Sequence, residues 1–151
     1  MSDEKLVEPS EQMVQGPLSY LIIANLIWNA CWLVGLAAPC FMLITEAGSA
    51  KGAFSGLIMF FLLIFAIFVL AIMAVHVMSI IALLKMRKGN FDIIKLYNVG
   101  SIAWVAICVL HAAQEPQYAF GSIPAAAVSV GLIIAMNLLV KKENLKNKVE
   151  I

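Results

Sequence analysis

The sequence predicts an all-α integral membrane protein whose chain crosses the bilayer four times as a helical bundle, with both termini on the cytoplasmic side. Hydrophobic residues make up 63% of the chain and the mean hydropathy is +0.97, whereas a soluble domain has about 45–50% apolar residues. Only 13% of the residues are charged, and most of these lie in the two tails and the connections. The four long apolar runs between them have lengths that suit membrane spans.

The predicted spans are residues 18–44, 54–84, 93–113 and 123–140. A polar cytoplasmic tail (1–17) precedes them and a basic cytoplasmic tail (141–151) follows. Backbone groups inside lipid must pair within their own segment, so each span is expected to be helical. The first run is longer than the core of a cleavable signal and is predicted to be retained.

The predicted spans differ in length. The second run would be about 45 Å long as a helix and the fourth about 27 Å, against about 30 Å of hydrocarbon. The second helix is therefore expected to tilt or to project from the membrane. Pro39 is expected to kink or end the first helix.

Basic residues predict the orientation. One basic group surrounds the connection between the second and third spans: Lys85, Arg87, Lys88 and Lys95. Four more lysines lie in the C-terminal tail, whereas the other two connections carry only Lys51. Since basic flanks stay inside, both tails are predicted to be cytoplasmic, in a bacterial inner membrane. The first basic group is also a candidate for binding anionic lipid headgroups.

Four polar residues of three predicted helices share one depth. Measured from the cytoplasmic ends, Asn25 and Asn29 lie about 10–16 Å deep, His76 about 13 Å and Ser101 about 12 Å. Such groups are costly when unpaired in hydrocarbon, so they are expected to point inward and meet. One interpretation is hydrogen-bonding between helices, worth about 0.6 kcal/mol per contact. The other is a ligand or proton-handling site centred on His76, because imidazole titrates near neutral pH.

Three stripes of residues recur at helical spacing. The third span has a stripe that is expected to face the interior: Tyr97, Ser101, Trp104, Cys108 and His111. The first span has a stripe of small residues: Ala24, Cys31, Gly35 and Ala38. The fourth has Ala127, Gly131 and Ala135, a pattern suited to close helix contact.

Cys108, His111 and Glu115 place three metal-ligand types on one helical face. Cys108 and Glu115 would be about 10 Å apart along the axis, so an ion could use His111 with only one of them. The alternative is that His111 and Glu115 are polar residues at the membrane interface. His76 and His111 differ in depth by about 14 Å, which argues against a shared haem, and no cofactor is predicted.

Several functional classes are disfavoured. A net charge of +1 without a basic patch gives no reason to expect nucleic acid as a partner. The cysteines, Cys31, Cys40 and Cys108, form no Cys-x-x-Cys pair, and the sequence carries no catalytic signature that predicts an enzyme.

Three hypotheses remain. The first is a non-catalytic protein that acts through helix–helix contacts as an accessory, assembly, immunity or sensing component, in a homo-oligomer or a larger membrane complex. The second is a channel or transporter protomer that functions as an oligomer. The third is a metal- or cofactor-dependent membrane enzyme.

Overall fold

The computed structural model describes residues 13–49, 51–52, 55–115, 117 and 119–149. This part of the chain forms four long helices and one 3₁₀ turn: α1 (Pro17–Ser49), α2 (Ser55–Arg87), η1 (Phe91–Ile93), α3 (Ile94–Gln114) and α4 (Ala119–Val149). All four helices are long and apolar enough to cross a membrane. The predicted all-α class with four candidate spans is therefore confirmed.

α1 does not end at Pro39, so of the two effects expected of this proline, a kink or an end of the helix, the structure excludes the end. The helix continues for ten more residues to Ser49. Proline removes one backbone hydrogen bond. In an apolar environment every further unpaired backbone group would cost free energy, so the remaining groups stay hydrogen-bonded within the helix. α1 and α2 have 33 residues each, which makes them about 50 Å long.

α4 is longer than the apolar run that predicted it. It has 31 residues and continues past Val140 through the basic segment to Val149. This segment contains neither glycine nor proline, and lysine near a helix C-terminus interacts favourably with the helix dipole. An exposed ion pair between Lys146 Nζ and Glu143 Oε2, at 3.5 Å, lies within this extension.

Two glycines with positive φ shape the ends of helices. Gly16 has φ +78° and its carbonyl accepts the Ser19 N–H at 3.0 Å, just before Pro17 begins α1. Gly89 has φ +83° and follows the end of α2, where its N–H donates to the Met86 carbonyl at 3.0 Å. This left-handed position is one that glycine adopts without a steric penalty, and it turns the chain toward η1.

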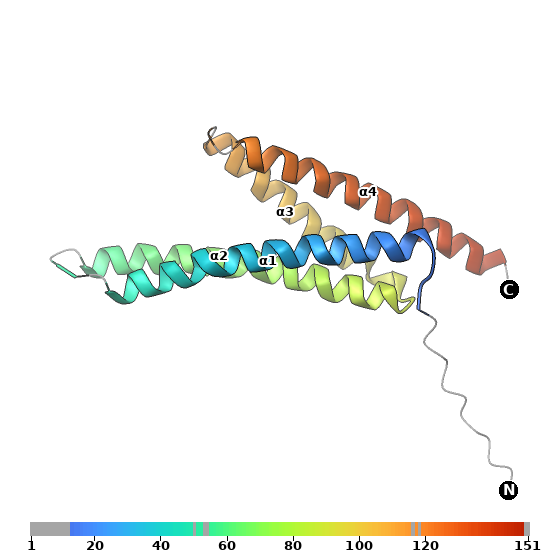
Figure 1. Cartoon of the computed structure of the whole chain (residues 1–151), viewed down its shortest axis with the longest axis horizontal. Coiled ribbons are helices and arrows are strands. Elements are labelled where there is room, and N and C mark those ends of the chain that lie inside the picture. The colour runs from blue at the N-terminus through green and yellow to red at the C-terminus, as the bar shows by residue number, and fades with distance from the viewer. Residues whose placement is uncertain (1–12, 50, 53–54, 116, 118, 150–151) are drawn as a thin grey trace, which may run out of the picture.

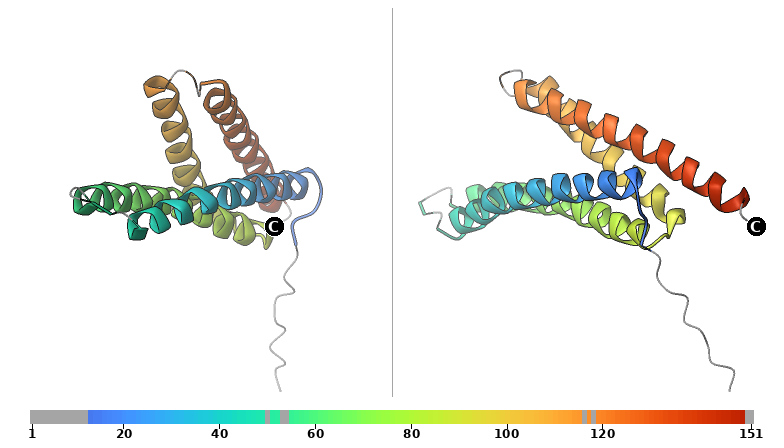
Figure 2. Two further views of the ribbon diagram at one scale, coloured as in Figure 1. Left: turned by 60° about the vertical axis from the view of Figure 1, so that its left-hand side comes forward. Right: turned by 45° about the vertical axis from the view of Figure 1, so that its right-hand side comes forward.

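The helices form two antiparallel hairpins, α1 with α2 and α3 with α4 (Figure 1). The hairpins converge at the end that holds the start of α1 and the end of α4, and diverge toward the other end (Figure 2). The segment before α1 is tied to the convergent end, because the Val14 N–H donates to the Arg87 carbonyl at 3.0 Å.

The buried apolar side chains gather where the hairpins converge. This core contains Leu18, Ile22, Ala82, Leu83, Met86, Phe91, Tyr97, Met136 and Val140. A smaller group packs around Trp104, Cys108, Ala125 and Ala126. Along the divergent half of the α1–α2 hairpin, the buried residues among those described are Cys40, Ala47 and Ala66. That half therefore presents mostly uncovered apolar side chains.

Gly100 sets the approach of α3 to α2. A Cβ atom at this position would lie 2.7 Å from Ser79 Oγ and 3.4 Å from the Val75 carbonyl oxygen. Only a residue without a side chain fits here unless Ser79 moves. Small residues at such crossings allow helices in membranes to pack closely.

We expect Gly100→Ala to lower the free energy of unfolding by about 1–3 kcal/mol, the usual cost of overpacking. Ser79→Ala should recover most of that loss, because it removes the atom nearest to the new methyl group. Within the described part of the chain, the hydrogen bond of Ser79 Oγ is the one that it donates to the Val75 carbonyl of its own helix, at 3.0 Å, so Ser79→Ala alone should cost little. Reversible unfolding in mixed micelles would measure all three variants. A double variant no more stable than Gly100→Ala would contradict this explanation.

Candidate functional site

Two asparagines of α1 hold fixed orientations inside the bundle. Asn25 and Asn29 are buried, one turn apart. The Asn25 Nδ2 group donates to the Leu21 carbonyl at 3.2 Å, and the Asn29 Nδ2 group donates to the Asn25 carbonyl at 2.9 Å. Because each amide nitrogen faces a backbone acceptor, each Oδ1 atom is left to accept hydrogen bonds from other helices.

Those oxygens join α1 to α2 and to α3. His76 Nδ1 lies 2.9 Å from Asn29 Oδ1, and the Tyr97 hydroxyl donates to Asn25 Oδ1 at 2.9 Å. His76 and Tyr97 are each only 1% exposed. Buried polar side chains of three helices therefore bond directly to one another.

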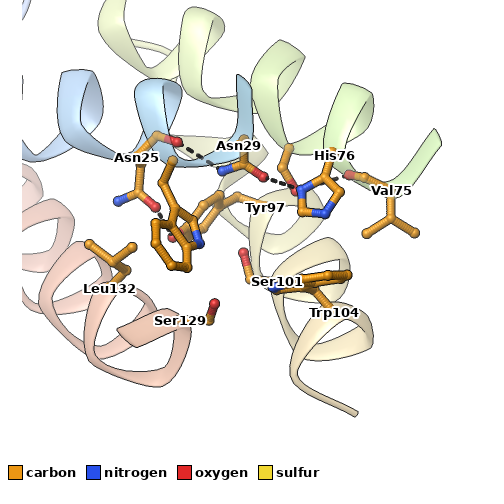
Figure 3. A pocket seen from close by; sticks show the side chains of 11 residues that line it. Asn25, Asn29, Val75, His76, Tyr97, Ser101, Trp104, Ser129 and Leu132 are labelled. Carbon is orange, nitrogen blue, oxygen red and sulfur yellow. Dashed lines mark hydrogen bonds between the residues drawn. The ribbon is translucent and has the colours of Figure 1, made fainter. Parts of the chain in front are cut away.

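A small cavity of about 10 Å³ lies among these side chains (Figure 3). Its lining comes from all four helices: Asn25, Trp28, Asn29, Val75, His76, Ser79, Tyr97, Ser101, Trp104, Ser129 and Leu132. Asn25, Asn29, His76 and Ser101, the four residues of the predicted polar cluster, all line it. None of the lining residues is Asp, Glu, Lys or Arg, so the cavity is polar but has no fixed charge.

Four buried polar atoms of this lining have no hydrogen-bond partner in the described part of the protein. They are Trp28 Nε1, His76 Nε2, Trp104 Nε1 and Ser129 Oγ. Each helix contributes one of them. An unsatisfied buried polar group costs about 1–3 kcal/mol, so a polar molecule bound in the cavity would stabilise the protein by hydrogen-bonding to these atoms.

The tryptophans form one aromatic group with His76. The Trp28 and Trp32 rings lie edge to face with centroids 5.8 Å apart, and Trp32 contacts Trp104 at 4.7 Å. Trp104 in turn contacts the His76 ring at 4.7 Å. The sequence has three tryptophans, so every indole of the protein lies in or beside the site.

Sequence reasoning missed several of the polar partners. Asn98 and Asn137 form a reciprocal amide pair between α3 and α4, with hydrogen bonds of 3.0 and 2.9 Å. The signal was present, because Asn98 lies three residues after Lys95 and Asn137 lies four before Lys141, which places both at one depth. The role of Trp28 and Ser129 could not be predicted in this way, since the direction in which their polar atoms point depends on the orientation of the side chains.

The stripe on α3 faces inward over part of its length. Tyr97, Trp104 and Cys108 are buried and Ser101 is half-buried, but His111 is exposed. His111 lies in the last turn of the helix, which ends at Gln114.

The candidate metal ligands do not form a cluster. Glu115 is exposed and its Oε2 accepts a hydrogen bond from Gln117 Nε2 at 3.2 Å, whereas Cys108 is buried. Within the described ranges, no group of three or more His, Cys, Asp or Glu side chains is arranged to hold a metal ion. The polar cavity is thus the best-defined candidate site in the described structure.

The basic residues proposed to meet lipid headgroups lie at the convergent end. Lys85, Lys88 and Lys95 are exposed and Arg87 is half-buried. They flank the turn between α2 and α3, at the same end as the start of α1 and the end of α4 (Figure 1). This placement leaves them accessible.

No family model matches the chain, and comparisons with curated proteins and with solved structures find no significant match.

Proposed function

We propose that this protein is a non-catalytic membrane component that acts through lateral helix contacts, first of all with a second copy of itself. The observation that carries the proposal is the small-residue stripe of α1. All four of its members, Ala24, Cys31, Gly35 and Ala38, are exposed. A Cβ atom added at Gly35 would meet nothing within 4 Å.

The stripe lies on a different face of α1 from the buried asparagines. Small residues permit close backbone approach between helices, and among the described helices none covers this stripe. The stripe of α4 supports the same idea, because Ala127 and Gly131 are exposed and a Cβ at Gly131 would also meet nothing within 4 Å. The divergent hairpins leave further apolar surface uncovered beside α1.

The proposal includes the orientation of the protein in the membrane. The basic residues around the α2–α3 turn and the lysines of α4 lie at one end of the bundle, together with the described starts and ends of the chain. Lys51 lies at the other end, between α1 and α2. By the positive-inside rule, the convergent end faces the cytoplasm, with a bacterial inner membrane as the proposed location.

Cys31 provides the test, because it is an exposed thiol within the stripe. A two-fold dimer through this face would bring each Cys31 near its own counterpart. We expect mild oxidation of native membranes to give a covalent dimer, since a disulfide requires Cα atoms within about 7 Å. Cys31→Ala should abolish the dimer, whereas Cys40→Ala and Cys108→Ala should preserve it because those thiols are buried.

Gly35→Leu should also prevent the dimer by blocking close approach. The matched control is Gly121→Leu, since Gly121 is likewise exposed with nothing within 4 Å but lies outside the stripe. A second protein that co-purifies stoichiometrically and is lost in Gly35→Leu would assign the face to a different partner. A monomer that neither cross-links nor retains any partner in mild detergent would refute lateral association.

A further inference from the structure

The central cavity has the properties of a binding site. Three of the side chains that carry its unpartnered atoms are more than nine-tenths buried, with exposed fractions of 1% for His76, 4% for Ser129 and 7% for Trp104. These atoms come from α2, α4 and α3, and Trp28 adds the fourth from α1. An occupant that bonds to all of them would connect every helix of the bundle.

The hydrogen bonds around His76 assign its tautomer. Asn29 Nδ2 donates to the Asn25 carbonyl, so the atom that faces His76 is the acceptor Oδ1. His76 Nδ1 must therefore carry the hydrogen of that bond. In the neutral ring, Nε2 is then a bare acceptor facing the cavity.

The unpartnered atoms consequently have a defined polarity. The two indole Nε1–H groups can only donate, His76 Nε2 can only accept, and Ser129 Oγ can do either. A water molecule matches this set, because its two lone pairs can accept from both indoles while its two hydrogens are donated to His76 Nε2 and to Ser129 Oγ. An alcohol has only one hydroxyl hydrogen and so cannot bond to all four atoms. A carboxylate has no hydrogen to donate to Nε2, and an ammonium has no lone pair for the indoles.

The absence of fixed charge in the lining also favours a neutral occupant. No Asp, Glu, Lys or Arg lines the described cavity, so an ion would be buried without a counter-charge. The volume of about 10 Å³ is close to the lower limit for one ordered water molecule. The apolar side chains of Val75 and Leu132 also line the cavity, and a volume this small leaves no room for the hydrocarbon substituent of an alcohol.

We propose that the cavity binds one water molecule. The bound oxygen bridges Trp28, His76, Trp104 and Ser129 and so holds the α1–α2 hairpin against the α3–α4 hairpin. This inference is independent of the lateral contacts proposed above, since it concerns the interior of a single chain.

Nuclear magnetic resonance of the full chain in detergent, with ¹⁵N-labelled tryptophan and histidine, tests the proposal. The sequence has three tryptophans and two histidines, so few signals need assignment. We expect His76 in the Nδ1–H tautomer. We also expect the indole hydrogens of Trp28 and Trp104 to receive magnetisation from a bound water molecule, whereas Trp32, which does not line the cavity, should not.

A titration with methanol tests the size and the hydrogen-bonding capacity of the site. If water is the occupant, transfer to Trp28 and Trp104 comes from the water signal and methanol causes no saturable shift. If methanol instead shifts both indole signals saturably and its methyl protons show contacts to them, the occupant is not a single water molecule.

Three results would overturn the proposal. These are the Nε2–H tautomer at His76, transfer that does not differ between Trp32 and the two cavity indoles, or saturable shifts with methanol, sodium acetate or ammonium chloride. Ser129→Ala should abolish the transfer, and Ser122→Ala, on the same helix but outside the cavity, should preserve it. The wild-type spectra decide the proposal even if Ser129→Ala does not fold.

Discussion

Leu83→Ala is expected to lower the free energy of unfolding by about 2 kcal/mol, whereas Leu84→Ala should change it by less than about 0.5 kcal/mol. The two leucines are adjacent in α2, but Leu83 is completely buried and Leu84 is 46% exposed. Leu83 lies in the core with Ile22, Met86 and Met136, where truncation would leave a cavity. Leu84 faces the surroundings of the bundle, where lipid fills the space of the lost methyl groups.

The size of this effect follows from the nature of the solvent. Lipid is as apolar as leucine, so transfer out of the solvent contributes little and packing dominates. A residual cavity costs about 24 cal/mol per Å³, so a void of roughly 80 Å³ accounts for about 2 kcal/mol. Reversible unfolding in mixed micelles gives both values. Equal losses in the two variants would mean that the buried face of α2 has been assigned incorrectly.

The second large effect concerns the hydrogen bond between Asn29 and His76. Asn29→Leu removes the acceptor of the His76 Nδ1–H group, and His76→Leu leaves Asn29 Oδ1 without its donor. Each single variant should lose about 1–3 kcal/mol, because each leaves one buried polar group unsatisfied. The double variant should lose clearly less than the sum of the two, since neither polar partner remains.

Asn137→Leu provides the control for this comparison of single and double variants. Asn137 bonds to Asn98 and to the Ile133 carbonyl, and no described hydrogen bond links it to His76. Its combination with His76→Leu should therefore be additive within about 0.5 kcal/mol. If the Asn29 and His76 variants were also additive, the buried bond would contribute nothing measurable to stability.

The depth of four residues in the membrane was enough to predict part of the candidate site. Asn25, Asn29, His76 and Ser101 were expected at one level, and all four line the same cavity. Asn98 and Asn137 also share one depth, so their pairing could be predicted from the sequence in the same way. Depth could not reveal Trp28, Trp104 and Ser129 as carriers of unpartnered atoms, because that depends on how each side chain is turned.

The sequence by itself determined the number and type of the elements, because hydrocarbon forces each long apolar run to satisfy its own backbone as a helix. Tertiary structure decided which face of each helix is inside: it buries Leu83 and exposes Leu84, and it turns the small residues of α1 outward. The physical reason is that lipid-facing and core-facing side chains are both apolar in a membrane protein. The periodicity that marks the buried face of a soluble helix is then largely absent, and only packing distinguishes the two sides.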